Sequence, residues 1–253
     1  VKNPIADPYI LGISSGASLG ATVAIFLGVG AVFGSNSIGI CAFIGAFLIS
    51  VLVQITANIG GRANSVRLLL AGTALGSVCS AFSNFVVYIA GDRDGIQTVT
   101  FWLMGSLANV SYRDVLLCAA IEIPCLAVAM ILRWKMNLLS LDQEEARSLG
   151  INVKKLRLAV ILIATIMTAV TVSVCGIIGW IGLVIPHIAR LLIGNDHRTL
   201  IPASVLMGSI YLLLIDTAAR AATAGEVPLS ILTAMVGAPF FAVILRKTSG
   251  GRE

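Results

Sequence analysis

Long apolar runs separated by short polar stretches dominate this sequence and limit what it can fold into. Seven of them approach or exceed the roughly 20 residues that a helix needs to cross a bilayer. They occupy residues 10–33, 37–59, 68–90, 112–133, 158–178, 200–222 and 227–245. An eighth run, 180–194, is shorter and contains Pro186. Only 11% of the 253 residues are charged, against about 25% in soluble domains. The chain therefore lacks the polar surface that water requires, and its solvent must be lipid.

These runs predict helices rather than strands. In lipid every backbone polar group must be satisfied internally, so only helices and closed barrels can span. The runs stay apolar over 18 or more residues without strict alternation, which excludes a barrel. We predict an all-α fold, a polytopic transmembrane helical bundle with about eight membrane-crossing helices, as one domain over residues 1–253.

The basic residues predict the orientation of the bundle. If the segment before residue 10 is cytoplasmic and the helices alternate, 14 of the 17 Lys and Arg residues lie in the cytoplasm. The other three are Arg93, Arg113 and Arg220. This asymmetry agrees with the positive-inside rule. The net charge of +5 is not clustered with aromatic residues on one face, so we predict no nucleic-acid partner.

One cytoplasmic stretch differs from the rest of the chain. Residues 133–157 carry nine charges in 25 positions. Helix-capping residues predict a short helix near 142–149, a turn at Gly150 and a second short helix near 152–157. An ordinary solvated loop is the alternative. On the outer side, residues 98–110 predict an interfacial helix with Phe101 and Trp102 at headgroup level.

Catalytic and metal-binding motifs are weak. Gly12–Gly16 matches the G-x-S-x-G nucleophile elbow, but the motif lies at a helix start after an Asp-Pro turn, with no strand before it, and the only histidines are His187 and His197. Its small residues instead predict close helix packing. The five cysteines and two histidines lack metal-ligand spacing. No phosphate-binding loop occurs. We predict no enzyme activity, cofactor or metal in this chain, and ATP hydrolysis on a separate subunit if transport is ATP-driven.

Two acids lie inside apolar runs, where a charge is costly. Asp216 precedes Arg220 by four residues, a spacing that places both on one helix face. Glu122 has no local partner. It faces either the bundle interior or a water-filled path, and the sequence does not decide between them.

Six blocks in order along the chain resemble the permease family of ABC importers for iron-siderophores, haem and cobalamin. They read NPIADPYILGISSGASLGA, RLLLAGTALGSVCSAF, FWLMGSL, SLDQEEARSLG, GIIGWIGLVIPHIARLLIGNDHRTLIP and VPLSILTAMVGAPFF. The family has ten transmembrane helices. The resemblance starts just before the third, so we expect the permease domain to be N-terminally incomplete here, without about the first two helices.

The resemblance also implies functional segments. Residues 136–157 resemble the cytoplasmic coupling segment, whose short helices dock on the ATPase subunit. The residues in it that carry this likeness are Leu141, Asp142, Glu145, Ala146, Leu149 and Gly150. The residues that resemble the cytoplasmic gate are Asn3, Ile5, Asn64, Ser65 and Val66. Arg220 is similar to an outward arginine that meets an acidic residue of the substrate-binding protein.

The expected function is therefore that of a multi-pass permease subunit in the bacterial cytoplasmic (inner) membrane. It would move an iron-siderophore, or a haem- or cobalamin-type chelate, by alternating access. The expected partners are an ABC ATPase subunit, a periplasmic or lipoprotein substrate-binding protein, membrane lipid and a second permease copy or paralogue in a dimer. A secondary transporter or channel without an ATPase is the alternative. It would need an intramembrane relay of acids or histidines, and two acids are too few.

Overall fold

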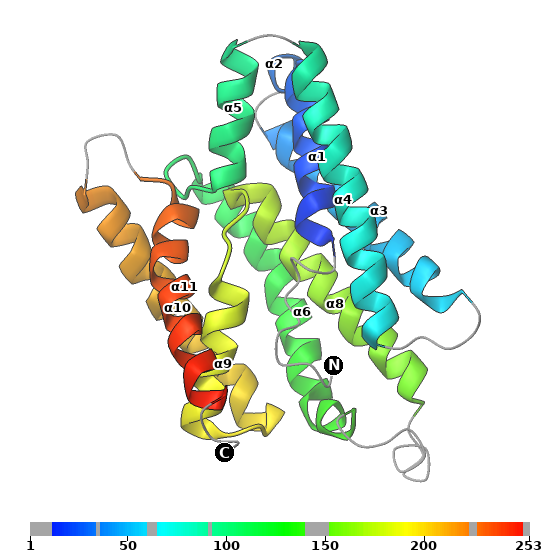
Figure 1. The fold of residues 1–253 in the computed structure, drawn as a ribbon, viewed down its shortest axis with the longest axis vertical. Coiled ribbons are helices and arrows are strands. Elements are labelled where there is room, and N and C mark those ends of the chain that lie inside the picture. The colour runs from blue at the N-terminus through cyan, green and yellow to red at the C-terminus, as the bar shows by residue number, and fades with distance from the viewer. Residues whose placement is uncertain are drawn as a thin grey trace.

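The computed structural model describes residues 12–33, 36–59, 65–90, 93–139, 152–222 and 227–249. These residues fold into a bundle of helices without strands in the described ranges, which confirms the predicted all-α class. Figure 1 shows α1 between α5 and α4, and α9, α10 and α11 grouped together beside α6.

The first apolar run is broken into two helices, contrary to the single crossing predicted for residues 10–33. Helix α1 covers Ile13–Phe26 and α2 covers Val29–Phe33. Gly28 between them has φ 63°, a left-handed conformation that glycine adopts without strain. This turn ends α1 after 14 residues. Helix α3 (Asn36–Asn58) then packs along α1.

Small residues bring α1 and α3 into close contact, as the sequence predicts for the Gly12–Gly20 face. A Cβ atom on Gly16 would lie 2.6 Å from the carbonyl oxygen of Gly45, and one on Gly20 would overlap the carbonyl oxygen of Cys41. The core beside this contact also consists mainly of small side chains, namely Ile13, Ala17, Ala21, Ala42, Ala46, Ala169 and Val172. Backbone proximity of this kind is the usual means of helix association in lipid.

Helices α4 (Ser65–Ala90) and α5 (Arg93–Met104) follow, and both pack against α1. The outer helix predicted for residues 98–110 is instead α5, which begins five residues earlier and ends at Met104. Trp102 packs against the α1–α3 core while Phe101 is exposed. After α5 the chain turns at Gly105. The next residue, Ser106, donates its N–H to the carbonyl of Cys175 at 2.9 Å. This bond joins the end of α5 to the end of α8 (Val153–Cys175).

Helix α6 (Tyr112–Leu138) begins with a capping box, in which Ser111 and Asp114 satisfy each other's backbone N–H groups. Asn152 is the N-cap residue of its partner α8, and its side chain accepts a hydrogen bond from the Lys155 N–H at 3.1 Å. Residues 153–157 are thus the first turns of α8 and not a separate short helix, so that prediction is wrong. Basic residues can continue a membrane helix into water because their long side chains reach the interface.

Helices α9 (Ile181–Ile193), α10 (His197–Ala222) and α11 (Leu229–Ser249) complete the described fold. Each of the eight predicted apolar runs contains a helix within the described residues. Among the described residues, five helices are long and apolar enough to cross a membrane, namely α3, α4, α6, α8 and α10. The apolar parts of α1, α9 and α11 are shorter. Many large apolar side chains are exposed, and α6 buries none of its residues. Such a surface requires lipid or a partner chain around it.

Candidate functional site

A polar stripe runs along the exposed face of α4. It consists of Thr73, Ser77, Ser80 and Asn84, all exposed. Their spacings of four, three and four residues place them on one side of a helix. The flanking exposed side chains are apolar, among them Leu70 and Phe82. The stripe therefore differs from the lipid-compatible surface around it.

Two members of the stripe satisfy themselves within the helix. The Thr73 hydroxyl donates to the Leu70 carbonyl at 3.0 Å, and the Ser77 hydroxyl donates to the Thr73 carbonyl at 2.9 Å. Hydroxyls bonded in this way still offer acceptor lone pairs to a passing ligand. The Asn84 amide has four hydrogen-bonding positions that one helix cannot satisfy. A row of such groups fits a polar path better than lipid tails.

The stripe was not predicted, although the sequence carries a signal for it. Polar residues at i, i+4, i+7 and i+11 recur inside the apolar run 68–90. Averaged over the run, they only lower its hydropathy slightly. Read at helical periodicity, they mark one face.

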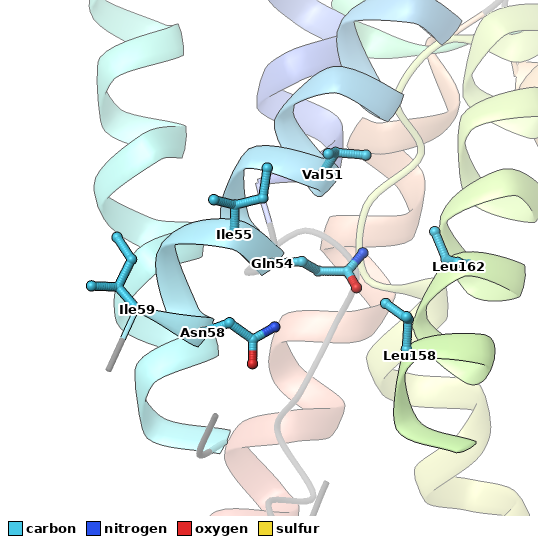
Figure 2. A pocket seen from close by; sticks show the side chains of 7 residues that line it. All are labelled: Val51, Gln54, Ile55, Asn58, Ile59, Leu158 and Leu162. Atoms are coloured by element: carbon cyan, nitrogen blue, oxygen red, sulfur yellow. The ribbon is translucent and has the colours of Figure 1, made fainter. Parts of the chain in front are cut away.

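A groove of about 520 Å³ lies between α3 and α8. Five apolar residues and two amides line it, namely Val51, Gln54, Ile55, Asn58, Ile59, Leu158 and Leu162. In Figure 2 the Gln54 side chain extends from α3 toward Leu158 and Leu162 on α8. The lining contains no charged side chain, so the groove is not suited to binding an ion.

The groove lies at the end of α3, next to part of the predicted gate. Of the gate residues, Asn3, Ile5 and Asn64 lie outside the described residues. Ser65 starts α4, and Val66 in its first turn is exposed. The Arg67 guanidinium donates to the Ile59 carbonyl at 3.1 Å. This bond ties the start of α4 to the end of α3, on either side of residues 60–64.

The predicted coupling residues from Leu141 to Gly150 all lie outside the described residues. The structure does place the two ends of that segment, because α6 ends at Leu138 and α8 begins at Val153. The α6 end is held by Asn137. Its side chain donates to the Asp196 carboxylate at 2.7 Å and accepts the His197 backbone N–H at 2.9 Å.

This contact connects the α6 end to the turn between α9 and α10. The Arg198 backbone N–H also donates to Asp196, at 2.9 Å. The Arg198 and Asn137 hydrogen bonds hold the pKa of the Asp196 carboxyl below its ordinary value. Because the folded-state pKa is depressed, the link stabilises the fold above the ordinary carboxyl pKa. That contribution is lost as the pH falls through the lowered value.

Glu122 finds a partner that the sequence could not identify. Its Oε1 accepts a hydrogen bond from the Thr171 hydroxyl of α8 at 3.0 Å. The same hydroxyl also lies 2.9 Å from the Met167 carbonyl oxygen. Of the two alternatives, this contact favours a side chain directed at the bundle, since it joins α6 to α8.

Asp216 and Arg220 form the ion pair that their spacing predicts. The Arg220 Nε lies 2.9 Å from the Asp216 Oδ2, and its Nη2 lies 3.4 Å from Oδ1. The Arg220 side chain is 45% exposed and that of Asp216 20%. The pair lies in the last two turns of α10. The guanidinium can therefore pair with Asp216 and still be accessible to another charged group.

Neither catalytic nor metal-binding geometry occurs in the described part of the chain. Gly12–Gly16 forms the first turn of α1, with the Gly16 N–H bonded to the Gly12 carbonyl at 2.9 Å. Within the described ranges, His, Cys, Asp and Glu residues form no group of three that could hold a metal ion.

Comparison with known proteins identifies a family of transport proteins that this chain matches. Residues 1–247 match the FecCD transport family. The chain is 36% identical to the molybdate import system permease protein of Haemophilus influenzae, over 99% of this chain and 73% of that protein. It is 42% identical to an iron chelatin transport system permease protein of Helicobacter pylori, over 98% of this chain and 74% of that protein.

A solved structure agrees with the sequence relatives. A metal-chelate type ABC transporter in an inward-facing conformation superposes with a TM-score of 0.88 at 36% identity. The match covers 97% of this chain and 78% of that chain. The chain therefore belongs to the FecCD transport family, as a multi-pass permease subunit of an ABC importer.

Proposed function

We propose that this permease imports a metal chelate, with a ferric siderophore as the substrate, across the bacterial cytoplasmic membrane. The carrying observation is the polar stripe on α4, Thr73, Ser77, Ser80 and Asn84, which presents neutral hydroxyl and amide groups. Many weak neutral contacts suit a large polar complex that must also be released. The 42% identity to an iron chelatin transport system permease protein of Helicobacter pylori also favours an iron chelate.

The stripe supports a passage between two permease copies. In a single chain it lies exposed beside apolar residues, where lipid would leave Asn84 poorly satisfied. Pairing two copies with their α4 stripes facing one another would line a polar path along the dimer axis. ATP binding and docking of the binding protein would favour different gate states of this path.

Uptake into proteoliposomes tests the substrate. The complete permease would be assembled with its ATPase and binding protein and supplied with internal ATP. We expect accumulation of an iron-loaded siderophore, blocked by excess siderophore and not by excess molybdate. ATP-driven uptake of molybdate, cobalamin or haem without siderophore uptake would reject the ferric siderophore as substrate.

The coupling, gate and docking assignments are part of this proposal. Residues 136–157 would contact the ATPase through Leu141, Asp142, Glu145, Ala146, Leu149 and Gly150. The Asn137–Asp196 bond would brace this segment against the α9–α10 turn. The gate would consist of Asn3 and Ile5 with Asn64, Ser65 and Val66.

Arg220 provides a separate prediction. Arg220→Glu should slow association with the binding protein about tenfold at low salt, because an exposed charge guides docking. Association kinetics measured at two salt concentrations check this. Replacing the partnering acidic residue of the binding protein with arginine should restore part of the association rate.

The ion pair with Asp216 gives the control. Asp216→Asn removes the pair but keeps the arginine charge, so docking should persist. If Arg220→Glu is instead rescued by Asp216→Arg, and the binding protein's charge has no effect, Arg220 serves only the helix.

A further inference from the structure

A second cavity, separate from the α3–α8 groove, lies among α1, α4 and α5. We call it the hydroxyl chamber. Its volume is about 280 Å³. Its polar lining includes Ser14, Ser18 and Thr22 of α1 and Ser80, Ser83 and Asn84 of α4. Val99 and Leu103 of α5 are among its apolar lining residues.

Two hydroxyls in this lining lack partners. Thr22 is 0% exposed and Ser83 6% exposed, and neither side-chain oxygen has a hydrogen-bond partner among the described residues. A buried hydroxyl without a partner is unfavourable and rare in native proteins. Elsewhere in this bundle two buried hydroxyls satisfy each other, since those of Ser50 and Thr165 form a hydrogen bond of 2.7 Å.

The chamber has a route to polar surroundings. Ser80 and Asn84 belong both to its lining and to the exposed polar stripe of α4. The chamber therefore begins at the stripe and extends inward to Thr22 and Ser83. Ser83 lies seven residues before the end of α4 at Ala90, which is about 10 Å along the helix axis.

The chemistry of the lining restricts the ligand. It contains hydroxyls, one amide and apolar side chains, without a charged group. Metal ions are usually bound by carboxylates and anions by basic groups, and the lining has neither. A cavity of this volume holds several waters at about 30 Å³ each, whereas a metal chelate is too large for it.

We propose that the hydroxyl chamber is a water-binding side branch of the translocation path. Water enters between Ser80 and Asn84 and supplies the hydrogen bonds that Thr22 and Ser83 lack. The inference rests on the proposed polar path along α4, because water reaches the chamber from there. Its function is to keep one wall of that path hydrated beside the substrate.

Thiol chemistry tests the chamber in the assembled complex. In a cysteine-free background, Ser83→Cys is treated with 2-aminoethyl methanethiosulfonate, and Ser50→Cys serves as the buried control. The thiolate attacks the reagent's sulfenyl sulfur, a mixed disulfide forms and methanesulfinate leaves. We expect Ser83→Cys to react at least about tenfold faster, because a dry buried thiol must wait for local opening. Equal rates at the two positions would overturn the proposal.

A measurement on the unmodified protein covers the case in which Ser83→Cys fails to assemble. Radiolysis of bound water should oxidise chamber residues Val87 and Leu103 more than the buried core residue Val53, and equal oxidation would count against a hydrated chamber. A failure of the chamber proposal can be distinguished from a failure of the proposed path. If a thiol at Ser77 on the stripe reacts while one at Ser83 does not, the path stands and the chamber is dry.

Discussion

Gly20→Ala is expected to destabilise the permease by about 1–3 kcal/mol, the usual cost of overpacking a close contact. The added Cβ would overlap the Cys41 carbonyl oxygen of α3. That atom belongs to a helix backbone and cannot rotate away, so α1 and α3 would have to separate. The surrounding core of small side chains would then lose its contacts as well.

The melting temperature of the purified protein and the yield of monodisperse protein measure this effect. Gly179→Ala is the matched control, because a Cβ at Gly179 would meet nothing within 4 Å. We expect the control to match the unsubstituted protein and Gly20→Ala to melt lower and yield less. If both variants behave alike, the α1–α3 contact is not as close as described.

Gly150→Leu is expected to uncouple ATP hydrolysis from transport. The branched side chain would disfavour a turn between two cytoplasmic segments and obstruct contact with the ATPase. Uptake should fall about tenfold or more, within the usual range of coupling free energies between sites. Insertion should be unchanged, because the substitution lies in the polar segment between α6 and α8.

Substrate-stimulated ATPase activity of the assembled complex is the readout. Ser148→Leu adds similar bulk in the same segment, outside the residues assigned to coupling, and should retain more activity. Normal stimulated activity in Gly150→Leu would mean that this segment does not couple the two subunits.

The helices could be predicted from the sequence because lipid imposes a strong and local rule. Each apolar run was expected to form a helix, and each contains one among the described residues, although the run 10–33 is divided into two. Their ends were less predictable. Glycine is common in membrane helices, so the break at Gly28 carried no distinctive signal. A separate short helix was predicted near residues 152–157, yet Lys154, Lys155 and Arg157 lie in the first turns of α8.

In the candidate site, contacts between residues close in sequence could also be predicted, and contacts between distant residues could not. The Asp216–Arg220 pair was predictable because its spacing is one helical turn. The Glu122–Thr171 bond joins residues 49 positions apart, and no local pattern indicates it. The α4 stripe was readable but was obscured by the apolarity of its run. The chamber needs three packed helices, so only the structure could define it.

Reactivity at Ser77 tests the proposed path along α4 most directly. Ser77→Cys, in a cysteine-free and transport-active complex, would be treated with a membrane-impermeant thiol reagent. Ser209→Cys is the control, since Ser209 is exposed on α10 with its hydroxyl bonded to the Val205 carbonyl at 2.9 Å. We expect that Ser77→Cys reacts, that modification stops uptake and that substrate slows the reaction, while Ser209→Cys stays unmodified in lipid. An unreactive Ser77→Cys, or full uptake after its modification, would contradict a translocation path along this face.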